Sequence, residues 1–86
     1  MTDPVTVIIP ARNEVQTIGQ VVTVLSAMAD VAEIVVIDNA SSDATAAVAR
    51  AAGARVVAEP RPGMGYAVRA GIAAATGKQT SGRGRF

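Results

Sequence analysis

Three short apolar segments of the chain have the composition of β-strands. They span residues 5–9, 33–38 and 55–58, and Val and Ile supply most of their side chains. Branching at Cβ favours extended backbone, and strands that are apolar at nearly every position are typical of parallel sheets covered on both faces. We therefore predict three buried strands, of which the third is the weakest.

Helical spacing fills the intervals between and after these segments. Apolar residues recur three or four positions apart over residues 15–29, which predicts a helix with one apolar face and with Asn13 as its N-cap. Residues 44–52 predict a second helix, because Gly53 follows them as a typical C-terminal stop. A third helix is expected over residues 64–76.

The predicted elements alternate as strand and helix three times, which indicates an α/β fold with a Rossmann-like parallel sheet. In a sheet with strand order 3-2-1, right-handed crossovers place the first two helices on one face. The third helix must then cover the other face. The first strand would lie at an open edge, and we expect little sheet beneath the third helix.

Composition limits the chemistry available to the chain. It has 86 residues, a net charge of +1, and neither cysteine nor histidine. Disulfides, thiolate zinc sites, cysteine nucleophiles and histidine bases are therefore excluded. The balanced charge gives no indication of nucleic-acid binding. No apolar run approaches the roughly 20 residues that a membrane span needs, and we expect a cytoplasmic protein.

Polar residues and glycines follow the predicted strands, at what would be one edge of the sheet. Ligands of open parallel sheets bind outside the carboxyl ends of the strands, so this edge is the predicted binding site. The residues after the three strands are, in turn, Pro10, Ala11, Arg12, Asn13 and Glu14; Asp38, Asn39, Ser41, Ser42 and Asp43; and Glu59, Arg61, Gly63 and Gly65. Helix capping is the alternative role for Asn13, Ser42 and Asp43.

Asp38 and the glycines around residue 64 are the most specific of these positions. The Asp38 carboxylate ends an apolar strand, where it can accept hydrogen bonds from a nucleobase or a ribose hydroxyl, or cap the next turn. Gly63 and Gly65 would let the backbone approach a phosphate at a helix start, although a lone Gly-x-Gly is a weak signal. Arg69 can reach an anionic group from the same helix, or be solvated.

Three motifs together resemble the N-terminal part of a family 2 glycosyltransferase. They are VTVIIPARNE at residues 5–14, IVVIDNASSDAT at residues 34–45 and GMGYAVRAG at residues 63–71. The resemblance covers residues 5–77 and points to enzymes that transfer sugars to polyprenyl phosphates and to relatives that glycosylate phosphoglycerate. It implies a GT-A fold, a UDP- or GDP-linked sugar donor, and a place at the inner membrane face for some full-length members.

The resemblance also implies a role for each matching residue. The residues that would bind the nucleotide sugar are Pro10, Ala11, Asn13, Glu14, Asp38, Asp43, Gly65 and Arg69. Those after the first strand would line the nucleoside pocket, Asp38 would contact the base, and Asp43 would hold the loop after the second strand against the next helix. Gly65 and Arg69 would flank the base and the ribose. Met64 stands where several relatives have lysine, so a phosphate contact is lost.

The family also uses features that this chain lacks. Its members bind Mg²⁺ or Mn²⁺ through an Asp-x-Asp motif after a fourth strand, and later residues supply a carboxylate base. Here the last acidic residue is Glu59. We therefore expect an incomplete nucleotide-sugar-binding domain over residues 1–77, without catalytic or metal-ligating residues and inactive alone, and a disordered basic tail over residues 78–86. A non-enzymatic nucleotide-binding module and a fragment that self-associates through its open edge are the alternatives.

Overall fold

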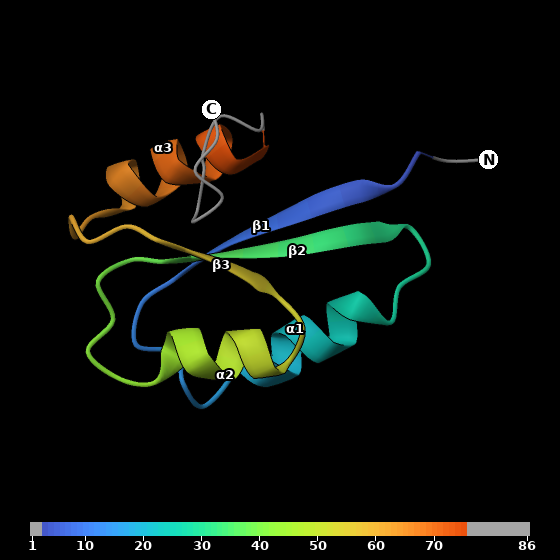
Figure 1. The fold of residues 1–86 in the computed structure, drawn as a ribbon, viewed down its shortest axis with the longest axis horizontal. Coiled ribbons are helices and arrows are strands. Elements are labelled where there is room, and N and C mark those ends of the chain that lie inside the picture. The colour runs from blue at the N-terminus through green and yellow to red at the C-terminus, as the bar shows by residue number, and fades with distance from the viewer. Residues whose placement is uncertain (1–2, 76–86) are drawn as a thin grey trace.

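The computed structural model describes residues 3–75 and shows strands and helices in strict alternation (Figure 1). The strands are β1 (Val5–Ala11), β2 (Val31–Asp38) and β3 (Arg55–Ala58). The helices are α1 (Ile18–Ser26), α2 (Thr45–Ala51) and α3 (Met64–Ala75). The order of elements predicted from the apolar pattern is confirmed. No helix in this part of the chain is long and apolar enough to cross a membrane.

The three strands form one parallel sheet with β2 in the centre, so the predicted order 3-2-1 is confirmed. Ala11 of β1 lies opposite Asp38 of β2, and Asp38 lies opposite Ala58 of β3. The last residues of all three strands therefore meet at one edge of the sheet. The loops that follow the strands leave from this edge, which is where the predicted binding residues lie.

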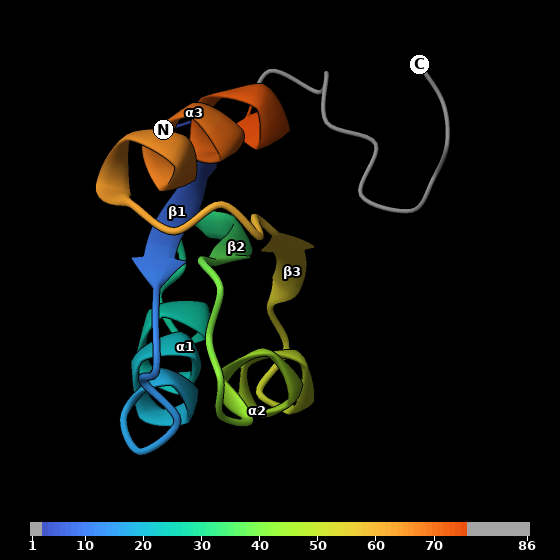
Figure 2. The same ribbon diagram turned by 90° about the vertical axis from the view of Figure 1, so that its left-hand side faces the viewer.

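The helices cover both faces of the sheet, with α1 and α2 on one face and α3 on the other (Figure 2). The side chains of β2 show this division. Ile34 and Val36 pack into the core beneath α1 and α2, whereas Val35 and Ile37 pack into the core beneath α3. Neighbouring side chains of a strand point to opposite faces, so β2 is buried on both sides.

More sheet lies beneath α3 than we predicted. Three alanines of α3 share a core with side chains of β2 and β3, and Ile8 of β1 packs against this core. The approach to β1 is so close that a Cβ atom at Gly71 would lie 2.8 Å from Cγ2 of Ile8. The expectation of little sheet beneath the third helix was wrong, because small residues let α3 settle directly on β1 and β2.

The start of α1 also differs from the prediction. The helix begins at Ile18, and its N-cap residue Thr17 makes no side-chain capping bond. Asn13 has a φ of 54°, and its side chain binds another loop. The capping role predicted for Asn13 was therefore wrong. Residue 76 and the tail predicted over residues 78–86 lie outside the described residues.

Candidate functional site

A hollow of about 250 Å³ lies at the carboxyl edge of the sheet, between the loop that follows β1 and the start of α3. Its lining residues come from the end of β1 and the loop after it, from the residue after β2, and from the start of α3 with the residue before it: Pro10, Ala11, Arg12, Glu14, Asn39, Gly63, Met64 and Ala67. Pro10, Ala11 and Glu14 belong to the predicted binding set. The hollow therefore lies where the topology of a parallel sheet favours ligand binding.

The wall formed by the loop after β1 is fastened to the loop after β2. The Asn13 side-chain oxygen accepts a hydrogen bond from the Ser42 N–H at 2.8 Å, and the Asn13 N–H donates to the Ser41 hydroxyl at 2.9 Å. The Glu14 N–H donates to the hydroxyl of the buried Thr45 at 2.8 Å. The side chains of Ser41 and Thr45 thus hold the backbone after β1, and the side chain of Asn13 holds the backbone after β2.

Asp43 strengthens the same junction. Its Oδ1 accepts hydrogen bonds from the Thr45 N–H at 2.9 Å and from the Thr45 hydroxyl, and its Oδ2 accepts one from the Val15 N–H at 3.4 Å. These bonds, that from the Thr45 hydroxyl above all, lower the pKa of Asp43. Asp43 and Asn13 line a second hollow, which shares Glu14 with the first.

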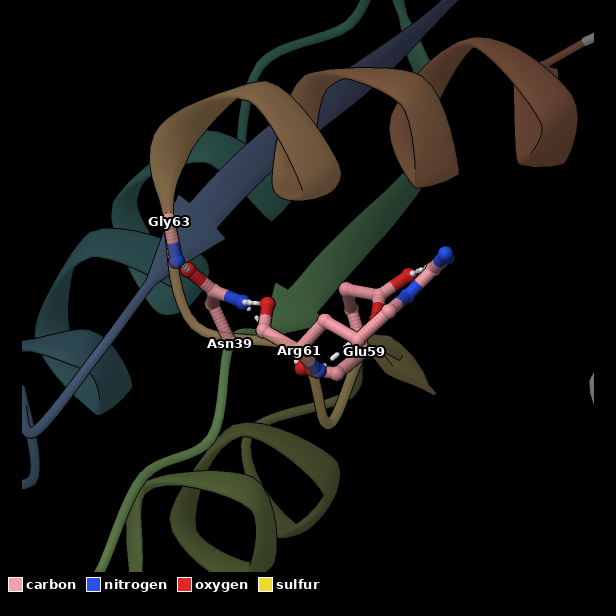
Figure 3. Close-up of polar contacts among 4 residues, drawn as sticks. All are labelled: Asn39, Glu59, Arg61 and Gly63. Carbon is pink, nitrogen blue, oxygen red and sulfur yellow. Dashed lines mark hydrogen bonds and ion pairs between the residues drawn. The ribbon is translucent and has the colours of Figure 1, made fainter.

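Asn39 holds the β3–α3 loop (residues 59–63), as Figure 3 shows. The last residue of this loop, Gly63, lines the hollow together with Met64 and Ala67 of α3, and these three form the opposite wall. The Asn39 side chain is buried, with the residue 5% exposed. The amide nitrogen donates to the Glu59 carbonyl at 3.1 Å and to the Arg61 carbonyl at 2.8 Å, and the amide oxygen accepts from the Gly63 N–H at 3.0 Å. One side chain thus binds three points of the loop.

Glu59 and Arg61 complete this loop. Arg61 donates from Nε and Nη2 to the two carboxylate oxygens of Glu59, each at 2.9 Å. These bonds, with one from the Arg61 N–H, lower the pKa of Glu59 from 4.5 to about 2. The carboxylate therefore stays ionised although its side chain is only 7% exposed. The Arg61 guanidinium also lies over the Tyr66 ring, 4.4 Å from its centre, which links the loop to α3.

Asp38 does not line the hollow. Its Oδ1 is buried and has no hydrogen-bond partner among residues 3–75, so this oxygen caps no turn there. The Asp38 backbone carbonyl, by contrast, accepts a hydrogen bond from the Glu59 N–H at 2.9 Å. A buried oxygen without a partner needs a physical explanation, and a donor from a ligand would supply one. The contact between Asp38 and a nucleobase stays a prediction.

The other two residues predicted to bind, Gly65 and Arg69, lie on α3 outside the hollow. A Cβ atom at Gly65 would meet nothing within 4 Å, so the free chain does not require glycine at this position. Gly63 is different, because its φ of 131° is strained for any residue with a side chain. Arg69 is exposed, and its charge contributes to the lowered pKa of Glu59. Nucleotide contacts of Gly65 and Arg69 stay predictions.

Arg12, Asn39 and Gly63 were predicted to lie at this edge but, like Met64, were not among the eight residues expected to bind the nucleotide sugar. All four line the hollow. The position of Asn39 directly after the central strand was a usable signal. Its importance depends on contacts with residues 20 to 24 positions away, which a sequence pattern does not reveal.

The described residues do not fit a divalent metal ion. Nowhere in residues 3–75 do three acidic side chains come close enough together to hold one. Magnesium and manganese require several oxygen ligands, and the carboxylates of Asp43 and Glu59 are occupied by hydrogen bonds to Thr45 and Arg61. We therefore derive no chemical step through a metal for this part of the chain.

Sequence relatives support one family. Residues 6–80 match the family model described as Glycosyl transferase family 2. An uncharacterized glycosyltransferase of Mycobacterium tuberculosis is 49% identical over 74 residues, which cover 86% of this chain and 33% of the relative. The glucosyl-3-phosphoglycerate synthase of Mycolicibacterium smegmatis is 39% identical over 83 residues, which cover 85% of this chain and 27% of the relative.

Comparison with solved structures supports the same family. The crystal structure of M. tuberculosis glucosyl-3-phosphoglycerate synthase matches with a TM-score of 0.74 and 39% identity over 84% of this chain and 30% of that one. A complex of that enzyme with Mn²⁺, UDP-glucose and phosphoglyceric acid matches with a TM-score of 0.67 and 38% identity over 77% of this chain and 27% of that one. The chain thus spans about a third or less of these relatives, and the expected GT-A fold is confirmed. On this sequence and fold similarity, the chain belongs to glycosyltransferase family 2.

Proposed function

We propose that this chain forms the UDP-sugar-binding part of a glycosyltransferase, and that the hollow at the carboxyl edge of the sheet holds the nucleotide. The hollow carries the proposal, because it combines Pro10, Ala11 and Glu14 with the start of α3. Support for the uridine nucleotide comes from relatives of known structure, which were crystallised with UDP and Mg²⁺ or with UDP-glucose and Mn²⁺.

The lining residues offer suitable chemistry for a nucleotide. Pro10 is exposed at the hollow and offers an apolar surface for the face of a base, whereas Ala11 is buried. The Glu14 carboxylate can accept hydrogen bonds from a base N–H or a ribose hydroxyl, and Arg12 is an exposed cation at the same hollow. α3 begins at Met64, which lines the same hollow, and the first N–H groups of a helix have no partner within it, so a helix start at this place favours the diphosphate.

For the whole protein, we propose transfer of glucose from UDP-glucose to a phosphoglycerate acceptor. This follows the relatives named glucosyl-3-phosphoglycerate synthase, one of which was crystallised with both compounds. A GDP-linked donor and a polyprenyl phosphate acceptor, which the resemblance also allowed, have no support from these relatives. A cytoplasmic location remains a prediction from the sequence.

Titration calorimetry of the 86-residue chain tests the binding proposal. We expect heat of binding with UDP and an affinity for GDP at least about tenfold lower, a difference of roughly 1.4 kcal/mol. Glu33→Gln serves as a control, because Glu33 pairs with Arg55 far along β2 from the hollow. Absence of UDP binding at millimolar concentration, or equal affinity for both nucleotides, would contradict the proposal.

Binding and transfer are separate expectations. We expect no transfer of glucose from UDP-glucose by the pure 86-residue chain with Mn²⁺ present. Its sequence has no acidic residue after Glu59, and the described carboxylates do not gather into a metal site. A metal-stabilised leaving group and an activated acceptor hydroxyl both require such groups. Metal-dependent transfer measured by chromatography of the reaction products would show that this expectation is wrong.

A further inference from the structure

We propose that Asn39 is a positioning residue, which sets the width of the hollow by holding its two walls at a fixed separation. The proposal rests on the proposed function only for the identity of the ligand. The contacts that carry it belong to the chain without a ligand.

The β3–α3 loop depends on side chains for its shape. Two of its five residues are prolines, so only three N–H donors remain. The Glu59 N–H donates to the Asp38 carbonyl at 2.9 Å, the Arg61 N–H to the Glu59 carboxylate at 2.9 Å, and the Gly63 N–H to the Asn39 amide oxygen at 3.0 Å. Each of the three backbone N–H groups of the loop therefore donates a hydrogen bond, and two of the three donate to a side chain.

Asn39 joins the two walls directly. Its backbone N–H donates to the carbonyl of Ala11, the last residue of β1, at 2.8 Å, and Ala11 lines the hollow on the β1 side. The Asn39 side chain binds the backbone of Glu59 and Arg61 in the β3–α3 loop and that of Gly63, which lines the opposite wall (Figure 3). A displacement of this one residue would therefore change the distance between Ala11 and Gly63.

The amide group is specific for this task, because it combines two donors and an acceptor on a short side chain. An aspartate has the same shape but would place carboxylate oxygens against the Glu59 and Arg61 carbonyls. A serine side chain is too short to reach both the Glu59 carbonyl and the Arg61 carbonyl. The body of α3 has its own attachment, since its alanines pack on the sheet. Loss of the Asn39 contacts should therefore release the loop and the first turn of α3 and leave the core in place.

The test compares Asn39→Asp and Asn39→Ser with the parent chain. Amide hydrogen exchange measured by NMR reports whether the Gly63 N–H is still held, and titration with UDP reports the state of the hollow. We expect the Gly63 N–H to exchange about tenfold faster and the Kd for UDP to rise about tenfold, as the loss of hydrogen bonds to a buried amide would produce. Amides in the centre of β2 should keep their protection.

Val36→Ala is the matched control. Val36 is fully buried on the opposite face of the sheet, so its truncation destabilises the chain without touching the loop. We expect Val36→Ala to leave the Kd for UDP within about twofold of the parent value. Asn39→Ser provides the same measurement without an added charge if Asn39→Asp does not fold.

Several results would overturn the proposal. Unchanged exchange of the Gly63 N–H in both variants would show that Asn39 does not hold the loop. Faster exchange with an unchanged Kd would show that the loop does not set the hollow. If Val36→Ala lost as much affinity for UDP as the Asn39 variants do, the lower affinity would be explained by lower overall stability and not by the position of the loop. A parent chain that does not bind UDP would contradict the proposed function, and the exchange result alone would then decide whether Asn39 positions the loop.

Discussion

Single residues at the sheet edge differ in how well their polar atoms are satisfied. Asp43 uses both carboxylate oxygens in hydrogen bonds, whereas Asp38 has a buried oxygen with no partner among residues 3–75. An unsatisfied buried acceptor costs about 1–3 kcal/mol. The two carboxylates therefore contribute with opposite signs to the free energy of unfolding, although they lie five positions apart in one motif.

Asp38→Ala should separate stability from binding. We expect the free energy of unfolding to rise by about 1 kcal/mol, because the unpaired oxygen is removed, and the affinity for UDP to fall roughly tenfold if Asp38 contacts the base. Chemical denaturation and calorimetry measure the two quantities. Asp43→Ala is the matched control and should lower stability. Equal UDP affinity in Asp38→Ala and the parent would show that Asp38 does not contact the nucleotide.

Protonation of Glu59 in acid should lower the free energy of unfolding of the chain. The pKa of Glu59 is about 2 in the folded chain and 4.5 ordinarily, so the folded state favours the ionised form. The resulting stabilisation is fully present above pH 4.5 and is lost as the pH falls toward 2. Asp43, whose pKa is also lowered, acts in the same direction. Unfolding measured between pH 6 and 2 should show a shallower decline for Glu59→Gln; parallel curves would argue against this coupling.

At the scale of elements, the contact between α3 and β1 depends on small side chains. The hypothetical Cβ at Gly71 lies 2.8 Å from Ile8, whereas the one at Gly65 lies in open space. Helix propensity favours alanine over glycine by about 1 kcal/mol at either position. The space around each glycine, and not helix propensity, should therefore decide whether a change to alanine raises or lowers the free energy of unfolding.

Gly71→Ala should destabilise the chain by about 1–3 kcal/mol, because α3 must move away from β1 to admit the methyl group. Gly65→Ala is its control and should leave the stability unchanged or raise it by up to about 1 kcal/mol. Thermal denaturation of the two variants measures the difference. Similar melting temperatures for both would indicate that α3 does not press on β1 in solution.

At the scale of the whole molecule, the β1 edge of the sheet lies beside an apolar groove. Among the described strands, β1 pairs only with β2. A groove of about 300 Å³, lined mainly by apolar residues, runs between β1 and α3. Val68 and Ile72, which line it, are 46% and 61% exposed, and Val5 at the start of β1 is 48% exposed. Unpaired strand edges beside apolar surface favour association with another chain.

We therefore expect the 86-residue chain to self-associate as its concentration rises. Thr6→Lys places a charge on the exposed β1 strand and should shift the average mass toward that of the monomer. Sedimentation equilibrium over a range of concentrations measures both effects. Glu33→Gln on the central strand is the control and should behave as the parent does. A parent chain that stays monomeric throughout would rule out association through this edge.

Local information in the sequence was sufficient for the element order and the parallel sheet. The two-sided helix cover followed once the strand order 3-2-1 was taken as given. Apolar runs and helical spacing act within a few residues, and crossover handedness then restricts how successive elements connect. The edge that carries the candidate site followed from the same rule, since ligands of such sheets bind at the carboxyl ends. On this basis Pro10, Ala11, Arg12, Glu14, Asn39 and Gly63 were placed at this edge, and all six line the hollow.

Only the tertiary structure decided which side chains at that edge work together. Asn13 looked like a helix cap, yet its partners are Ser41 and Ser42, 28 and 29 positions away. Asn39 became the link between two walls because the sheet brings residues 20 and more positions apart into contact. A hydrogen bond between distant segments depends on how strands align and helices dock. The small residues Ala67, Ala70, Gly71 and Ala74 follow helical spacing, but that spacing does not reveal how closely α3 approaches β1.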